Sequence, residues 1–166
     1  MTSADPPLPA GVSIRRAYDD EGPALADLYL CVRRENADVI PPVVHSDDSV
    51  RDWWSTVLPG RAELWVAELD GAAVGVMALE RPDGLEQLYV AGSAAGRGIG
   101  SALLAVARRE LGGRVQLWTF QANTGARRFY ERHGFVAVEQ TDGDNEEGAP
   151  DVRYLSVGGP GADGAT

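Results

Sequence analysis

Residues 85–104 constrain the fold of this chain more than any other stretch. They begin with a short apolar and aromatic run, residues 85–90, which predicts a buried strand. Glycines and alanines follow, and from Ile99 onward the apolar residues recur at helical spacing. A strand, a glycine-rich loop and a helix in that order point several unpaired backbone N–H groups at one spot, where the helix dipole also favours negative charge. The stretch therefore predicts a site for a phosphate group at the start of a helix.

The residues of this loop exclude the two commonest nucleotide-binding patterns. A Walker A loop requires Lys and then Ser or Thr after its last glycine, whereas Gly100 is followed by Ser101 and then alanine. The dinucleotide pattern G-x-G-x-x-G, read from Gly96 or from Gly98, ends on a residue that is not glycine. Glycine at these positions still permits close backbone approach and a positive φ. A phosphate loop of another kind and a plain strand-to-helix turn both stay open at this point.

Two segments of the chain resemble the motifs of the GCN5-related N-acetyltransferases (GNAT). Residues 88–90 and 96–104 resemble the family's acyl-CoA-binding motif, Q/R-x-x-G-x-G/A, and residues 123–135 resemble its second motif. One position departs from the motif, because Ala95 stands where the family usually has Gln or Arg; Arg97 is the residue that would compensate. The resemblance covers residues 12–157 and implies an acyl-CoA N-acyltransferase fold of the α/β class, built on a mixed sheet.

The resemblance also implies acetyl-CoA as the co-substrate and assigns residues to it. The loop would hold the pyrophosphate through its backbone. The backbone groups of Leu88 and Val90 would meet the pantetheine amides in a cleft where two parallel strands splay apart. Asn123 would support the pantetheine arm, and Arg127 would face the same cleft from the following helix. The residues implied to bind the coenzyme are Leu88, Tyr89, Val90, Ala95, Gly96, Arg97, Gly98, Ile99, Gly100, Ser101, Asn123 and Arg127.

The resemblance places Tyr130 near the sulfur of the coenzyme, and a tyrosine suits the role of general acid. Acyl transfer expels a thiolate, and a thiol with a pKa of about 8.5 is readily reprotonated by a phenol with a pKa of about 10. The alternative is a packed tyrosine whose hydroxyl is satisfied by hydrogen bonds. Residues 123, 127 and 130 fall on one face of the predicted helix, and residues 122, 126, 129 and 133 fall on an adjacent face that is expected to be the core face.

Glu86, on the predicted central strand, is the candidate general base for an alkyl ammonium, whose pKa is about 10.4. A strand glutamate plays this part in many members of the family, and a surface or packing carboxylate is the alternative. Alternation along the strand predicts that Glu86 shares a face with Leu88 and Val90, whereas Gln87 and Tyr89 face the other way. The backbone N–H of Val90 or Tyr89 would hold the oxyanion. Direct transfer in a ternary complex needs no enzyme nucleophile.

Aromatic and ionisable residues near two predicted helices are candidates for the acceptor site. They are Tyr29, Glu35, His45 and one of the neighbours Trp53 and Trp54; the alternative is core packing with one partly exposed tryptophan. His45 has no Cys or His at metal-ligand spacing, so no metal site is predicted. An acidic loop at residues 142–147 could also meet an amine, although solvated loop charges are the commoner explanation.

Composition narrows the partners of the chain. Its 166 residues carry a formal net charge of −10, which argues against a nucleic-acid partner and fits a cationic substrate better than an anionic one. The single cysteine, Cys31, permits no internal disulfide and is expected to be a buried small hydrophobe rather than a covalent catalyst. With no signal peptide recognised and no apolar run long enough to span a membrane, a cytoplasmic protein without a membrane partner is expected.

The remaining segments predict a single domain at residues 12–157 between flexible tails at residues 1–11 and 158–166. Besides the central strand, strands are predicted at residues 12–17, 62–69, 72–81, 115–118, 135–139 and 152–157, with a hairpin turn at Asp70-Gly71. Helices are predicted after a cap at Asp19 or Asp20, and at residues 47–58, 98–111 and 123–133. These elements predict a six- to seven-stranded mixed sheet with about four helices on both faces.

Together these features predict an acetyl-CoA-dependent N-acetyltransferase that acts on a primary amine of a small molecule, an amino acid or a peptide. A catalytically silent acyl-CoA-binding or sensing module on the same fold is the alternative, because Ala95 replaces the usual side chain and the base is not fixed. The motifs also leave room for a longer or charged acyl group. A homodimer is compatible with the sequence, although no feature dictates one.

Overall fold

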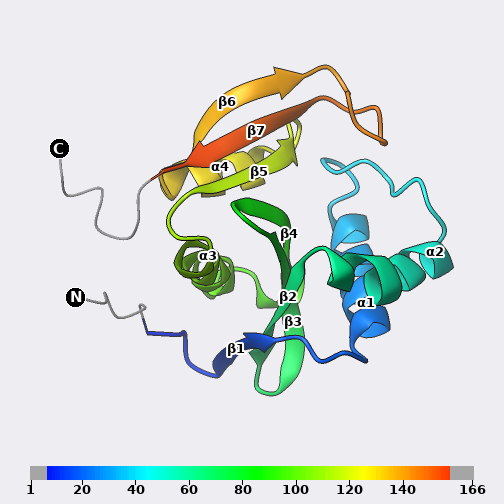
Figure 1. Cartoon of the computed structure of the whole chain (residues 1–166), viewed down its shortest axis with the longest axis vertical. Helices are drawn as coiled ribbons and strands as arrows, with labels where there is room; N and C mark the ends of the chain where they lie inside the picture. The colour runs from blue at the N-terminus through cyan, green and yellow to red at the C-terminus, as the bar shows by residue number, and fades with distance from the viewer. Residues whose placement is uncertain (1–6, 158–166) are drawn as a thin grey trace.

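The computed structural model describes residues 7–157, so residues 1–6 of the predicted N-terminal tail and the predicted C-terminal tail at residues 158–166 lie outside the described part of the chain. Within it, one seven-stranded mixed sheet has the strand order β1-β2-β3-β4-β5-β7-β6, with helices on both faces (Figure 1). The strands are β1 (Val12–Arg16), β2 (Glu63–Leu69), β3 (Ala72–Glu80), β4 (Gly84–Val90), β5 (Val115–Phe120), β6 (Val136–Thr141) and β7 (Asp151–Ser156). The helices are α1 (Gly22–Glu35), α2 (Asp47–Asp52), α3 (Ile99–Glu110) and α4 (Thr124–Arg132). This architecture confirms the predicted fold class.

Turn and cap chemistry explains where several of these elements begin and end. Asp70 and Gly71 both have positive φ, 52° and 84°, as a two-residue hairpin turn between β2 and β3 requires. The N-cap of α2 is Ser46, whose hydroxyl accepts the Ser49 N–H at 3.2 Å. The predicted cap of α1 at Asp19 or Asp20 is wrong. Glu21 precedes that helix, and its carboxylate is engaged by Arg15 and by the Tyr18 N–H instead.

The second predicted helix runs past the end of α2. It continues through a wide turn at Trp53–Val57 and a tighter one at Leu58–Gly60, which brings Trp54 into the core with 1% of its surface exposed. Cys31, by contrast, is on the exposed side of α1, so its predicted burial is wrong. The helical stripe of buried residues contains its neighbours Leu30 and Val32, and the thiol lies 3.6 Å from the Glu35 carboxylate four residues later.

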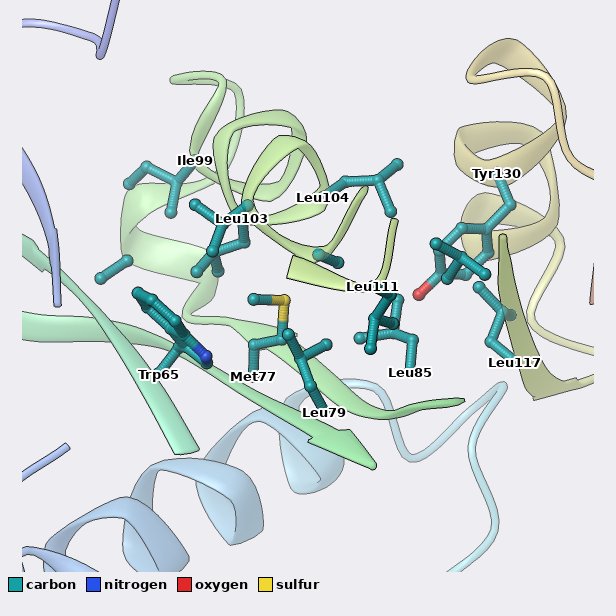
Figure 2. Packing of buried hydrophobic residues seen from close by; sticks show 14 of the residues in the cluster. Trp65, Met77, Leu79, Leu85, Ile99, Leu103, Leu104, Leu111, Leu117 and Tyr130 are labelled. Atoms are coloured by element: carbon teal, nitrogen blue, oxygen red, sulfur yellow. The ribbon is translucent and has the colours of Figure 1, made fainter. Parts of the chain in front are cut away.

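Two cores cover opposite faces of the sheet. Beneath α3 and α4, the side chains of β3, β4 and β5 pack against one another (Figure 2). On the other face, α1 and the segment from α2 to Leu58 pack over β2, β3 and β4, with Leu25, Tyr29 and Trp54 at the centre. Because both faces of β2 and β3 are buried, these strands are almost continuously apolar. Among residues 7–157, no helix is long and apolar enough to cross a membrane.

The parallel strands β4 and β5 are neighbours over a very short length. Their register joins only Gly84 to Gln116, and the Gln116 N–H donates to the Asp83 carbonyl at 2.8 Å. Beyond this point the two strands diverge (Figure 1), whereas β5 pairs with β7 along its whole length. The sheet therefore opens between the carboxyl ends of β4 and β5, where the predicted coenzyme cleft lies.

Candidate functional site

The glycine-rich loop connects the open end of β4 to α3. After a single turn at Gly92–Ala94, Gly96 and Gly98 adopt φ of 78° and 79°, which L side chains rarely adopt. The Ala94 and Ala95 N–H groups are bonded within this turn. For the N–H groups of residues 96–101, no acceptor exists within residues 7–157. These donors surround the positive end of the α3 dipole, so the loop offers a binding site for an anion, as its sequence predicts.

Side chains from α4 and α1 hold the loop in place. The Ser101 hydroxyl lies 3.0 Å from Nε2 of His133, while Nδ1 of His133 lies 2.7 Å from the Phe129 carbonyl. Since a carbonyl only accepts, Nδ1 carries a proton, and in the neutral imidazole Nε2 then accepts from Ser101. On the other side, the Glu35 carboxylate accepts the Gly92 N–H at 3.1 Å. Glu35 therefore positions the loop, and it is not among the residues that line the cavity of Tyr29, His45 and Trp53, with which it was predicted.

Tyr130 is the most buried residue of α4, with 8% of its surface exposed. Its ring packs against Phe129 and Phe135 at centroid distances of 5.2 and 5.5 Å. The hydroxyl points away from α4 toward Leu85 and Leu111 (Figure 2). No group within residues 7–157 forms a hydrogen bond with this hydroxyl. The alternative of a packed tyrosine with a satisfied hydroxyl is therefore not what the structure contains.

The surroundings of Tyr130 keep it protonated at neutral pH. Burial, and secondarily the nearby Tyr89 hydroxyl, raise the pKa of Tyr130 well above its usual value. A phenol in this state can donate a proton to a thiolate but cannot act as a base near pH 7.

Two other predicted residues of α4 have structural partners. Asn123 is the N-cap of α4, and its side-chain oxygen accepts the Ala126 N–H at 3.2 Å. Arg127 was expected to face the central strand, but its Nε donates to the Tyr154 hydroxyl at 3.0 Å and its Nη1 to the Gln121 carbonyl at 3.4 Å. The expectation is wrong because Tyr154, on β7, supplies the partner from 27 residues farther along the chain. The core face of α4 includes Tyr130, beside the expected Ala126 and Phe129.

A β-bulge in β4 changes the orientation of Glu86. Ala78 pairs with Gln87 and Leu79 pairs with Leu85, so Glu86 is the extra residue and the two-residue period breaks there. Leu85, not Glu86, joins Leu88 and Val90 in the core under α3. The prediction that Glu86 shares their face is therefore wrong.

The Glu86 carboxyl lies against a second carboxyl and beside an open cavity. It is within hydrogen-bonding reach of Glu80, which itself pairs with Arg61 at 3.2 Å. The side chain of Glu86 is exposed, but desolvation by the neighbouring protein raises its pKa, the hydrogen bond with Glu80 raises it further, and Arg61 lowers it. Glu80, Glu86 and Trp118 line a cavity of about 360 Å³ at the paired end of β4 and β5. A carboxyl with these neighbours can accept a proton from a group in that cavity.

The backbone of β4 presents specific groups to the opening toward β5. The Ala91 N–H donates to the Val74 carbonyl on β3 at 2.7 Å. Because successive N–H groups of a strand point to opposite edges, the Tyr89 N–H also points to β3, and those of Leu88 and Val90 point to the opening. Of the two predicted oxyanion donors, Val90 therefore has the suitable direction and Tyr89 does not.

A buried arginine that the sequence analysis missed organises the face under α1. Arg33, 7% exposed, donates to the Tyr29 hydroxyl at 3.0 Å and to the Pro41 carbonyl at 2.8 Å, and it pairs with Glu147 at 3.5 Å. It also reaches the Tyr89 hydroxyl. Burial raises the pKa of Tyr29 to about 12, so this cluster carries neutral phenols around one guanidinium. A lone arginine in a helical pattern gives no signal of such a role.

The acidic loop closes over this face. Glu146 lies 3.1 Å from Nε2 of His45, and Glu147 is held by Arg33, so the loop is tied to α1 and to the segment before α2. A cavity of about 350 Å³ lies beneath it, lined by the predicted Tyr29, His45 and Trp53, together with Gln87 and Glu146. The carboxylates of the acidic loop are thus partly paired rather than simply solvated.

Comparisons with known proteins agree with this geometry. A family model described as an acetyltransferase (GNAT) domain matches residues 60–137. The chain is 29% identical over 133 residues to the peptidyl-lysine N-acetyltransferase YiaC of Escherichia coli (strain K12), covering 76% of this chain and 84% of that protein. The fold is similar to that of a GCN5-related N-acetyltransferase from Rhodopseudomonas palustris, with a TM-score of 0.74, 18% identity and coverage of 90% and 98% of the two chains.

A second solved structure with this fold contains the coenzyme. It is yncA from Salmonella typhimurium with its cofactor acetyl-CoA, which has a TM-score of 0.63 and 19% identity, with coverage of 89% of this chain and 93% of the other. The family match agrees with two features of the structure. These are the strand, glycine loop and helix in sequence, and the opening between β4 and β5. This chain belongs to the GCN5-related N-acetyltransferase family and is an enzyme of the acetyltransferase class.

Proposed function

We propose that this enzyme transfers an acetyl group from acetyl-CoA to a primary amine by direct attack in a ternary complex. The observation that carries the proposal is the hydroxyl of Tyr130, which is protonated and has no hydrogen-bond partner within residues 7–157, on a side chain whose ring is packed in the core. It points from α4 toward Leu85 on β4 (Figure 2). Because no group of the described chain occupies this hydroxyl, it is available to donate to a ligand.

The residues present suit acetyl-CoA. The free N–H groups of residues 96–101 would bind the pyrophosphate, and the outward N–H and carbonyl groups of Leu88 and Val90 would pair with the pantetheine amides. Bound there, the coenzyme supplies an activated acetyl group and a thiol leaving group. Ala95 contributes only backbone, so the loop binds through dipoles and N–H groups rather than through a Gln or Arg side chain. Arg127 is not assigned to the coenzyme, because Tyr154 and Gln121 occupy its guanidinium.

Three groups of the chain would carry the chemistry. Glu86 would accept the proton of the acceptor ammonium, directly or through a water molecule in the adjoining cavity. The Val90 N–H would stabilise the oxyanion that forms when the amine attacks the thioester carbonyl. Tyr130 would then protonate the departing thiolate. The number of protons is conserved, because Glu86 takes one proton from the amine and Tyr130 gives one to the sulfur.

Thiol release in the presence of an amine panel tests the proposal. The panel contains free amino acids, alkyl amines and a lysine-containing peptide, the last because the similar E. coli protein is named as a peptidyl-lysine N-acetyltransferase. We expect at least one amine to release CoA from acetyl-CoA and to gain an acetyl group detectable by mass spectrometry. Isothermal titration with acetyl-CoA is run in parallel. Micromolar binding without thiol release from any amine would favour the silent module instead.

The choice of acyl group is tested with the same assay. We propose acetyl as the transferred group and compare acetyl-CoA with propionyl-, butyryl- and succinyl-CoA at equal concentration. A higher kcat/KM for a longer or charged acyl group would replace acetyl in the proposal but would leave the roles of Tyr130 and Glu86 unchanged.

A further inference from the structure

Among the residues that the structure describes, no helix covers one face of the β5–β7–β6 half of the sheet. The helices α1 and α2 pack over β2, β3 and β4, and α4 lies on the other face of β5 (Figure 1). Side chains alternate along β5, so Leu117 is buried under α4 with 4% of its surface exposed, and Trp118 emerges on the open face with 48% exposed. A half-exposed tryptophan beside a reaction centre is an available contact for a ligand.

Trp118 separates two cavities on this face. The first is the cavity of about 360 Å³ that contains Glu80 and Glu86. The second has about 420 Å³ and is lined by Trp118, Phe120 and residues of β6, β7 and the acidic loop. Because Trp118 belongs to both linings, the two cavities adjoin at this side chain, one containing the candidate base and the other lying farther along β5. The two cavities together are treated as one groove. This groove is defined here as the acceptor groove.

Charge in the far half of the acceptor groove has one sign. Its lining contains the carboxylates of Glu139, Asp144, Glu147 and Asp151, and it contains no Arg, Lys or His. Arg153 and Arg33 pair with Glu139 and Glu147 from outside the lining. The Asp144 carboxylate has no partner within residues 7–157. The Asp151 carboxylate accepts from Thr141 and Asn145, so Asp144 is the carboxylate of this lining that is left for a ligand. A cation is the complementary occupant beside it, and the face of Trp118 also favours a neighbouring cation.

From this charge complementarity we propose that the acceptor groove binds an unbranched alkyl diamine. One amine lies at Glu86, the methylene chain crosses Trp118, and the second ammonium lies among the carboxylates of the far half. The inference rests on the proposed function, since it names the acceptor of the same transfer. The new N–C bond forms as the thioester C–S bond breaks, Glu86 takes the proton from nitrogen, and Tyr130 gives one to sulfur. Trp118 is thereby a specificity-determining residue.

Three amines of equal length but different terminal charge test the inference. They are 1,5-diaminopentane, pentylamine and 5-aminopentanoate, each assayed for thiol release with acetyl-CoA at fixed pH and ionic strength. We expect kcat/KM to be at least tenfold higher for the diamine than for pentylamine, and lowest for 5-aminopentanoate. Equal values for the diamine and pentylamine, or a preference for 5-aminopentanoate, would overturn the inference. Turnover of none of them, when a peptide amine is acetylated, would overturn it as well.

Substitution of Trp118 supplies a second readout. We expect Trp118→Ala to lower kcat/KM for the diamine at least tenfold, mainly through KM, and Trp118→Phe to recover part of the loss. The control is Tyr18→Ala, which removes another exposed aromatic side chain, 63% exposed and outside both linings, and is expected to leave all three amines unaffected. Unchanged kinetics for Trp118→Ala would contradict the inference.

The outcomes also separate this inference from the proposed function. If no amine of any kind releases thiol, the proposed function fails. If amines react but show no dependence on terminal charge, only the diamine groove fails. Sedimentation of the wild type and of Trp118→Ala tests whether a second copy of the chain, rather than a diamine, occupies this face. A dimer that dissociates on this substitution would make the open face an interface and would overturn the inference.

Discussion

Replacing Tyr130 by Phe removes one oxygen atom and separates catalysis from stability. The hydroxyl has no hydrogen-bond partner within residues 7–157, so its loss removes no protein hydrogen bond. The ring keeps its packing against Phe129 and Phe135. We therefore expect the free energy of unfolding to change by less than about 0.5 kcal/mol. Loss of a general acid lowers turnover by about 10²- to 10⁴-fold.

Tyr154 provides a matched control in the same core. Its ring centroid is 6.2 Å from that of Tyr130, and its side chain is fully buried. Its hydroxyl accepts from Nε of Arg127 at 3.0 Å and donates to Oε1 of Glu131 at 2.9 Å. Hydrogen bonds to charged groups contribute about 1.5–3 kcal/mol, so Tyr154→Phe is expected to lose about 2 kcal/mol, or about 4–8 °C in Tm. Its turnover is expected to stay within about threefold of wild type, because the hydroxyl has only structural partners.

Three measurements compare the two variants with the wild type. Thermal melting followed by circular dichroism gives Tm, isothermal titration gives the Kd for CoA, and thiol release with a saturating amine gives kcat. For Tyr130→Phe we expect an unchanged Tm, a Kd within about threefold and the large loss of kcat. Wild-type turnover by Tyr130→Phe would refute the general-acid role. A loss of stability as large as that of Tyr154→Phe would refute the view that the Tyr130 hydroxyl is unpartnered.

The pH profile and the coenzyme loop give further predictions. Glu86 must be deprotonated to act as a base, and its raised pKa places the acid limb of kcat/KM above the ordinary carboxyl value of about 4.3. Glu80→Gln removes the neighbour that raises this pKa and should move the limb to lower pH, whereas Arg61→Gln should move it to higher pH; unmoved limbs would exclude Glu86 as the base. Ala95→Gln restores a side-chain donor and should lower the Kd for CoA about threefold to tenfold in isothermal titration, and an unchanged Kd would contradict this.

Local patterns predict the order and type of the elements because those patterns act over a few residues. The Asp70-Gly71 turn requires two positive φ values, and these residues tolerate them. Gly134, with φ of 86°, follows α4 as the helix-ending glycine that its position predicts. The alternation of small loop residues and glycines before Ile99 likewise identifies the start of α3. The conformation of the loop and the start of α3 follow from this short segment, so they were predictable.

Positions that depend on distant partners were not predictable in this way. The bulge at Glu86 inserts one residue into β4, and a period of two cannot reveal it. Arg127 turns to Tyr154 and Glu35 turns to Gly92, both across more than 25 residues. The exposure of Trp118 depends on the absence of a helix over one face of β5 among the described residues, which only the arrangement of the layers decides. Side-chain roles thus required tertiary structure, whereas element types did not.

The opening between β4 and β5 leaves backbone groups unpaired, and this cost predicts how the coenzyme stabilises the fold. The N–H groups of Leu88 and Val90 point into the opening, whereas that of Tyr89 points to β3. If pantetheine amides pair with this edge, binding adds the missing strand contacts. At a coenzyme concentration of 100 times Kd, linkage gives about 2.7 kcal/mol of extra stability, which is about 5–10 °C in Tm.

Amide hydrogen exchange locates this stabilisation residue by residue. In the free enzyme we expect Leu88 and Val90 to exchange faster than Tyr89, whose N–H is directed into the ladder with β3. With saturating CoA, the Leu88 and Val90 amides should gain protection from exchange. The Tyr89 amide, which is the internal control, should gain only the protection that follows from the higher stability of the whole domain. Equal gains at all three amides would mean that the coenzyme stabilises the domain without pairing to this edge, and the Val90 N–H would then lose its assignment as oxyanion donor.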